Sequence, residues 1–135
     1  MTITASTIIG HPSYAGGGIY NNGQLTVNDV SIIWNHAEQV GGGIFNAGTA
    51  TVNGIVGNAI DYAPGIYRPV SLSAISYNTG FYNGSGGVHN AGTLTLNGAS
   101  VLSNSGGVWN PSGGVVSSGT LTVVNSMIGD NHGAA

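Results

Sequence analysis

The sequence predicts an all-β fold of stacked coils, a parallel β-helix, and three observations support this prediction. The phrase GGGIYNNGQLTVN at 16–28 returns as GGGIFNAGTATVN at 41–53 and as GGVHNAGTLTLN at 86–97. Equivalent residues recur about every 20–27 positions, which is the period of a stacked repeat. Within each copy apolar and polar residues alternate, and no 3.6-residue apolar period occurs, so strands are favoured over helices. We expect about five to six coils with three short strands each.

The composition favours one folded domain over residues 1–135. Hydrophobic residues make up 41% of the chain, and their alternating placement argues against disorder. Charged residues make up only 4%, against about 25% in ordinary soluble domains. The surface must therefore be neutral Asn, Ser, Thr and Gly, or be covered by a partner. The coil boundaries that the repeats predict are 1–24, 25–49, 50–69, 70–93, 94–120 and 121–135.

The same composition disfavours several classes of function. A net charge of −3 with one basic residue, Arg68, argues against nucleic-acid binding, which relies on clustered Lys and Arg. The chain has no cysteine, so disulfides and zinc–thiolate sites are excluded. No apolar run approaches the roughly 18 residues of a membrane-spanning helix, and no signal peptide is visible.

Each coil is justified by its own residues. In the first coil, Met1, Ile3 and Ile8 alternate with hydroxyl residues, as in a strand with one buried face. The second coil is the most regular, and residues 35–39 are expected to form a polar corner loop. The third is shorter, because DYAP at 61–64 replaces the Gly run. The fourth regains the pattern, the fifth carries an inserted loop at 111–118, and the sixth stops before its Gly-aromatic segment.

The aliphatic residue after each Gly run is expected to form the core. This column consists of Ile19, Ile44, Ile66, Val88 and Val108. Burial of such a side chain contributes roughly 1.5–3 kcal/mol. The preceding Gly residues are expected to allow a positive φ or a close approach of two backbones at a corner.

Two polar columns are predicted to stack along the coils. The first is a ladder of side-chain amides, in which each Asn bonds to those above and below: Asn21, Asn46, Asn90 and Asn110. The second is a file of hydroxyl residues, with a partial neighbouring file at Gln24, Thr49, Thr93 and Thr120: Thr2, Thr26, Thr51, Ser71, Thr95 and Thr122. Flat Thr arrays of this kind also occur in ice-binding proteins, but β propensity on an exposed face explains the file more simply.

An aromatic stripe is the most informative column. Each member follows an inward aliphatic residue, so alternation places it on the outside: Tyr20, Phe45, Tyr67, His89 and Trp109. Exposed apolar stripes usually mark an interface or a ligand groove. We expect this stripe to be covered by a neighbouring subunit or by the loop at 111–118, and glycan stacking is the alternative.

The acidic residues do not favour an enzyme. Glycosidases need two carboxyl groups roughly 5–9.5 Å apart. The four acids fall at different phases of the repeat or on distant coils: Asp29, Glu38, Asp61 and Asp130. The histidines near one corner phase are likewise spread over different coils. We therefore expect no catalytic site, no metal and no cofactor.

The phrases GGGIYNNGQLTVNDVSIIWN and GGGIFNAGTATVN resemble the Gly-rich right-handed β-helix repeats of bacterial surface proteins, such as polymorphic outer-membrane proteins and autotransporter passenger domains. The resemblance covers nearly the whole chain, but only at the level of the repeat class. It implies a right-handed coil and an extracellular or cell-surface location. The chain is much shorter than such passengers, which suggests a fragment or a subunit that regains length by assembly.

The ends of the predicted solenoid favour self-association. Solenoids need polar capping repeats to stay soluble, and no cap is recognisable at either end. The residues expected to stack against another copy are Met1, Ile3, Ile8, Leu121, Val123 and Ile128. A contact of one end on the other does not close and gives a filament. The preferred hypothesis is a non-enzymatic fibre, matrix or adhesin shaft that binds itself. The alternative is a surface module that binds glycans through the aromatic stripe or, as a weaker option, ice through the Thr file.

Overall fold

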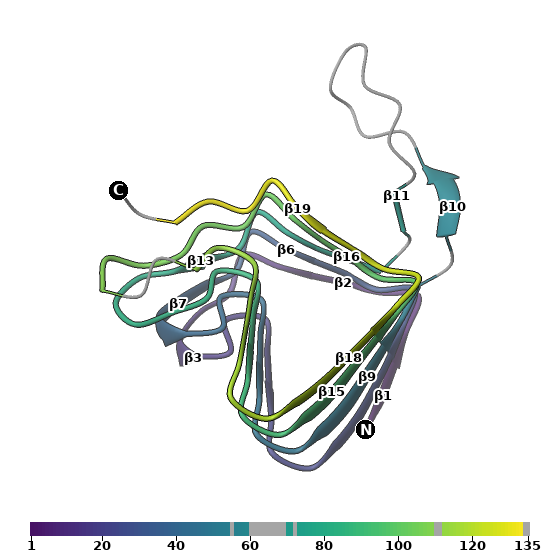
Figure 1. Ribbon diagram of the computed structural model, residues 1–135, viewed down its shortest axis with the longest axis horizontal. Helices are drawn as coiled ribbons and strands as arrows, with labels where there is room; N and C mark the ends of the chain where they lie inside the picture. The colour runs from purple at the N-terminus through teal and green to yellow at the C-terminus, as the bar shows by residue number, and fades with distance from the viewer. Residues whose placement is uncertain (55, 60–69, 72, 110–111, 134–135) are drawn as a thin grey trace.

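The computed structural model describes residues 1–54, 56–59, 70–71, 73–109 and 112–133. Every regular element in these residues is a β-strand, and four of the five sheets are parallel. Seen end-on, three sheets form the sides of a triangle, with a lobe on one side and a hairpin at another corner (Figure 1). The chain turns counterclockwise in this view as it approaches the reader. The predicted right-handed parallel β-helix is therefore confirmed.

The first side of the triangle, the threonine wall, is a sheet of five parallel strands. Its residues pair in register, so that Thr26 lies between Thr2 and Thr51. Its strands in spatial order are β1 (Thr2–Thr4), β5 (Gln24–Asn28), β9 (Thr49–Asn53), β15 (Thr93–Asn97) and β18 (Thr120–Val124).

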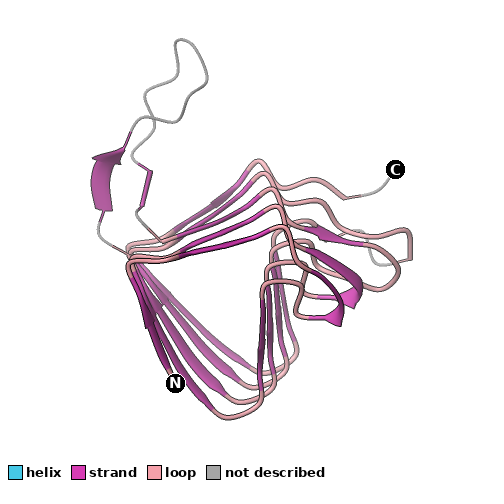
Figure 2. Cartoon of the chain, turned by 180° about the vertical axis from the view of Figure 1, so that it is seen from behind, coloured by secondary structure: helices cyan, strands magenta, loops and turns pink. Residues whose placement is uncertain are grey.

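The second wall and the aromatic wall complete the triangle, and both are parallel sheets (Figure 2). The second wall consists of β2 (Thr7–Ile9), β6 (Ser31–Ile33), β12 (Ala74–Ser76), β16 (Ser100–Leu102) and β19 (Met127–Gly129). The aromatic wall consists of β4 (Ile19–Asn21), β8 (Ile44–Asn46), β14 (Val88–Asn90) and β17 (Val115–Ser117). These three walls are the three strands per coil that the sequence predicts.

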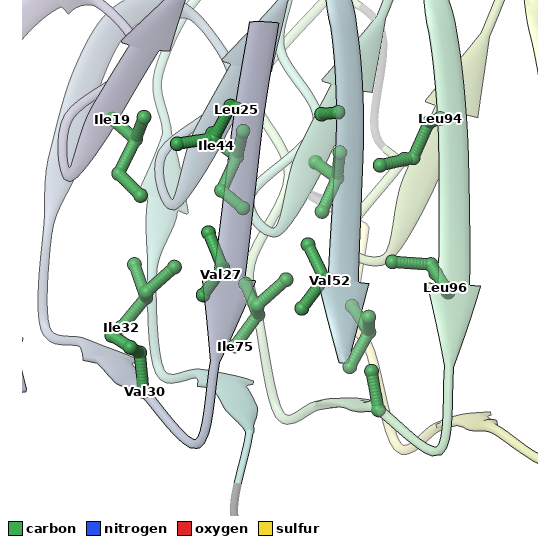
Figure 3. Close-up of a cluster of buried hydrophobic side chains, with 14 residues drawn as sticks. Ile19, Leu25, Val27, Val30, Ile32, Ile44, Val52, Ile75, Leu94 and Leu96 are labelled. Carbon is green, nitrogen blue, oxygen red and sulfur yellow. The ribbon is translucent and has the colours of Figure 1, made fainter. Parts of the chain in front are cut away.

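Aliphatic side chains from the three walls fill the triangle in columns (Figure 3). On the second wall Ile32, Ile75 and Val101 pair in register and are fully buried. Ile19, Ile44 and Val88 form the corresponding column on the aromatic wall, as predicted. Val108, which was expected to continue this column, is exposed instead, and Val115 pairs with Val88. Ile66 lies outside the described residues.

The corners depend on residues that accept a left-handed backbone. At the corner after the second wall this residue is not always Gly: Trp34, Tyr77, Ser103 and Asp130 have φ between 50° and 58°. Such a conformation costs roughly 1–2 kcal/mol for an L-residue, so neighbouring contacts must hold it. The Gly runs serve close approach as well as positive φ, because a Cβ at Gly42 would overlap the Thr79 carbonyl oxygen.

Residues 49–92 make one turn of the solenoid, where the sequence predicted the two coils 50–69 and 70–93. β9 pairs directly with β15, and β8 pairs directly with β14. Between them, β10 (Val56–Ala59) and β11 (Val70–Ser71) pair antiparallel and form a hairpin that projects from the corner between the threonine wall and the second wall (Figure 1). The solenoid therefore has about four turns and the start of a fifth. A three-residue apolar–hydroxyl–apolar match cannot distinguish a wall strand from a hairpin strand.

A lobe replaces the corner between the second wall and the aromatic wall in the first three turns. Its parallel strands are β3 (Pro12–Ala15), β7 (His36–Val40) and β13 (Thr79–Gly80). The predicted polar loop at 35–39 is therefore wrong, because β7 occupies it. Hydrogen bonds from Phe81 N to Ala37 O and from Trp109 N to Tyr82 O, at 2.9 and 3.0 Å, extend the lobe across later coils. The loop expected at 111–118 likewise contains the wall strand β17.

Candidate interaction surfaces

The outer face of the threonine wall carries three rows of neutral polar side chains. Five of the six predicted hydroxyl residues form its central row: Thr2, Thr26, Thr51, Thr95 and Thr122. Ser71 does not belong to it, because it lies in β11 of the hairpin. The neighbouring row is Gln24, Thr49, Thr93 and Thr120, all four exposed. Because the strands pair without a register shift, these rows form a regular grid.

The third row of this face is held by side-chain amides. Asn53 Nδ2 donates to Asn28 Oδ1 at 2.9 Å, and Asn97 Nδ2 donates to Asn53 Oδ1 at 3.3 Å. None of the residues in the three rows carries a charge. The wall is thus a neutral surface that is polar across its strands except where the exposed Val124 ends the third row on β18.

The predicted Asn ladder runs along the corner that follows the aromatic wall. Asn21 Nδ2 donates to Asn46 Oδ1 at 2.6 Å, and Asn46 Nδ2 donates to Asn90 Oδ1 at 2.7 Å. The next partner is not the predicted Asn110, which lies outside the described residues. Asn90 Nδ2 donates instead to Ser117 Oγ at 2.9 Å. The register of β14 against β17 explains this, because it pairs Asn90 with Ser117.

A second Asn ladder follows the second wall and was not predicted. Asn35 Nδ2 donates to Asn78 Oδ1, Asn78 Nδ2 to Asn104 Oδ1 and Asn104 Nδ2 to Asn131 Oδ1, at 3.0–3.1 Å. The backbone N–H groups of Asn35, Asn78 and Asn104 donate to the same oxygens. Each Asn of this ladder, from Asn35 to Asn131, directly follows a residue with a positive φ. The ladder therefore holds the backbone of this corner in place. Its signal in the sequence was the recurrence of Asn after Trp34, Tyr77, Ser103 and Asp130.

Only three members of the predicted aromatic stripe form a continuous stack on the aromatic wall. The rings of Tyr20 and Phe45 lie 5.0 Å apart at 18°, and those of Phe45 and His89 lie 5.5 Å apart at 10°. Tyr67 lies outside the described residues, and Phe45 pairs directly with His89. Trp109 is not in the stripe, because Val116 pairs with His89. We call Tyr20, Phe45 and His89 the wall stack.

His89 ends the wall stack and is partly buried. Its Nδ1 is buried and has no hydrogen-bond partner among the described residues. Burial lowers the pKa of His89 from the usual 6.5, because removal from water disfavours the charged imidazolium. At neutral pH the ring is therefore an uncharged aromatic partner of Phe45.

Trp109 belongs to a second group of aromatic rings on the lobe, which was not predicted. We call His36, Phe81, Tyr82 and Trp109 the lobe cluster. The Phe81 and Tyr82 rings meet edge to face at 4.7 Å and 83°, and Tyr82 and Trp109 lie 5.6 Å apart at 38°. A shallow cavity of about 330 Å³ lies beside them, lined by His36, Glu38, Phe81 and Tyr82. The cluster depends on contacts between three coils that no single repeat reveals.

The last coil exposes residues of the core columns. Leu121 and Val123 are 36% and 44% exposed, whereas their register partners Leu94 and Leu96 are fully buried. Ile128 is 44% exposed, although its partner Val101 is buried. At the other end Ile3 and Ile8 are partly buried, and Met1 is 72% exposed.

The acidic and histidine residues are not gathered into one site. In the parts of the chain that the structure describes, no three His, Asp or Glu side chains lie close enough to hold a metal ion. Asp61 lies outside those parts. Across the same residues, no helix has the length and apolar character needed to cross a membrane.

Comparison with known proteins adds no family assignment. The chain matches no protein-family model, and it has no significant match among curated proteins or solved structures. The structure shares with the repeats of bacterial surface proteins the stacked parallel architecture. What the protein does has to be argued from its own surfaces.

Proposed function

We propose that this protein is a structural subunit that associates with itself end to end, forming a shaft outside the cell. The observation that carries the proposal is the last coil, where Leu121, Val123 and Ile128 continue core columns but stay exposed. Buried residues of this type contribute roughly 1.5–3 kcal/mol each. A further coil from a second copy would bury all three.

The two ends have matching patterns. β1 and β18 are the two edge strands of the same wall, and both present a hydroxyl residue beside an inward aliphatic residue. If β1 of a second copy pairs with β18, Thr2 lies beside Thr122 and Ile3 beside Val123. Parallel edges with free backbone groups recruit strands of this kind. Such a head-to-tail contact repeats without closing, so it produces a filament.

The absence of charged side chains from the end strands supports this contact. Edge strands usually avoid pairing by carrying Lys or other charged residues. The end strands β1, β2, β18 and β19 contain none. The extracellular setting rests on the resemblance of the repeats to those of bacterial surface proteins.

Electron microscopy and light scattering over a concentration series test this proposal. Filaments should appear as concentration rises, with an axial repeat of about 24 Å, since five strands of the wall are stacked at about 4.8 Å each. Val123→Lys places a charge in the exposed end column and should reduce association at least tenfold. The matched control is Thr122→Lys, on the outer face of the same strand, which should leave filaments intact. A wild-type protein that stays monomeric at every concentration would overturn the proposal.

A second candidate function rests on the threonine wall. Its central row is continuous over five strands and its neighbouring row over four, so hydroxyl groups repeat in two directions. Such a grid suits an ordered polar surface such as ice. Thermal hysteresis of the wild type, lost in Thr51→Lys but kept in Asn22→Lys at an exposed corner, would support it. No measurable hysteresis in the wild type would remove this candidate.

A further inference from the structure

We propose that the lobe carries a binding site for a neutral carbohydrate, formed by Phe81, Tyr82 and Trp109 together with Glu38 and His36. The site is separate from the end surfaces and from the predicted wall stack. It lies where segments of three coils run side by side. The proposal is independent of filament formation.

The first argument is the geometry of the rings. In the wall stack, and in the pair Trp34–Tyr77 at 10° and 4.9 Å, each ring covers the face of its neighbour. In the lobe cluster the rings meet at 38–83°, so no ring lies flat on the face of its neighbour. Trp109 is 73% exposed and Phe81 is 46% exposed. Open aromatic faces attract the C–H face of a sugar ring, because the π-face is electronegative and the C–H groups are slightly positive.

The second argument is the polar lining. His36 and Glu38 line the cavity of about 330 Å³ together with Phe81 and Tyr82, and the His36 ring lies 6.2 Å from that of Phe81. This volume is at the lower end of the range for small-molecule sites. A purely apolar ligand would leave those polar groups without partners as it removed them from water. A sugar satisfies both requirements, since its hydroxyl groups bond at the edge while its C–H face stacks.

The negative charge of Glu38, with no Lys or Arg among the described residues, favours a neutral ligand. The described residues contain no Lys or Arg, since the chain's single basic residue is Arg68. Glu38 is exposed at the cavity and would repel uronic acids or sulfated sugars. A neutral hexose-based glycan meets no such penalty.

The fourth argument is the rigid backbone beneath the rings. Phe81 N donates to Ala37 O and Tyr82 N to Glu38 O, both at 2.9 Å, while Val108 N donates to Phe81 O at 2.8 Å. Gly107 lies so close to Phe81 that a Cβ there would overlap the Phe81 carbonyl oxygen. Asn83 Nδ2 also donates to Gln39 Oε1 at 3.2 Å beside the cavity. These bonds hold the loop segments that carry the rings, and a site that is ordered before binding loses less conformational entropy on binding.

The two tryptophans allow a direct test. Trp34→Phe leaves Trp109 as the only indole, and Trp109→Phe leaves Trp34, which stacks on Tyr77, as the matched control. Both variants are titrated with neutral gluco-, manno- and galacto-oligosaccharides while tryptophan emission is recorded. We expect saturable emission changes in Trp34→Phe with at least one of these sugars, and no saturable change in Trp109→Phe. Equal responses in the two variants, or no saturable response in either, would overturn the proposal.

Calorimetry locates the site further. Trp109→Ala and Tyr82→Ala should each weaken binding at least tenfold, whereas Tyr20→Ala in the wall stack should leave it unchanged. Glu38→Gln keeps the shape of the cavity and should weaken binding of neutral sugar by less than the aromatic variants do. Circular dichroism establishes that each variant is folded. Wild-type affinity in a folded Trp109→Ala and a folded Tyr82→Ala would overturn the assignment to the lobe.

Discussion

The wall stack and the lobe cluster contain the same kinds of side chain but pack them differently. In the wall stack, the strand register brings Tyr20, Phe45 and His89 directly over one another, and their rings stack face to face. In the lobe, the rings of the consecutive residues Phe81 and Tyr82 meet edge to face. Register therefore decides whether aromatic rings stack on one another or remain tilted and exposed.

The largest expected effect comes from breaking the unpredicted Asn ladder, which fixes the corner where the lobe leaves the walls. Asn78→Ala removes the acceptor of both the backbone and side-chain N–H groups of Asn35, and the donor to Ile32 O and Asn104 Oδ1. Since each unsatisfied buried group costs about 1–3 kcal/mol, we expect a loss of about 3–5 kcal/mol, measured by urea unfolding. Asn22→Ala at an exposed corner is the control and should change stability by less than about 0.5 kcal/mol. A small loss in Asn78→Ala would mean that water replaces the ladder.

The next effect contrasts one ring from each group. Phe45 is packed between Tyr20 and His89, whereas Phe81 is 46% exposed. We expect Phe45→Ala to lower the free energy of unfolding by about 2–3 kcal/mol and Phe81→Ala by about 1 kcal/mol, because cost follows the packed area that is lost. The same urea titrations measure both. Equal losses would show that the lobe rings are as tightly packed as the wall stack.

Gly107→Ala should destabilise the lobe locally and leave the stability of the walls unchanged. The added methyl group would overlap the Phe81 carbonyl oxygen, and overpacking of this kind costs about 1–3 kcal/mol. Hydrogen exchange should become faster at Val108 and Trp109 but remain slow at the wall residues Thr51 and Val52. Ser118→Ala, at an exposed position directly after β17, should leave all of these rates unchanged. If exchange accelerates equally in walls and lobe, the two do not open separately.

The smallest effect is a pH dependence that belongs to the wall stack. The pKa of His89 is lowered in the folded state, so below pH 6.5 the unfolded chain binds more protons than the folded one. The stability contribution of neutral His89 is therefore present above the unfolded pKa and is lost as pH falls below it. His89→Phe should reduce the loss of thermal stability between pH 7.5 and pH 5, whereas His132→Phe on the exposed last coil serves as the control. An unchanged pH profile in His89→Phe would contradict this account.

The repeated phrases were sufficient to predict the class of fold and much of its core. Alternation assigned Ile19, Ile44 and Val88 to the interior, and all three are buried. It also identified the amide ladder through Asn21, Asn46 and Asn90. These features depend on local alternation and on the repeat period, both of which are properties of the sequence alone.

Only the tertiary structure decided which copies of the pattern are neighbours. It placed Ser71 in a hairpin rather than in the threonine wall, and it gave Asn90 the partner Ser117. It also moved Trp109 from the aromatic wall to the lobe. The physical reason is that an insertion changes the number of residues between equivalent positions of two coils. Hydrogen bonds between coils then form in the register that places the buried side chains of one coil on those of the next. A local pattern shows which way a side chain points, but only the packing of coils determines what it meets.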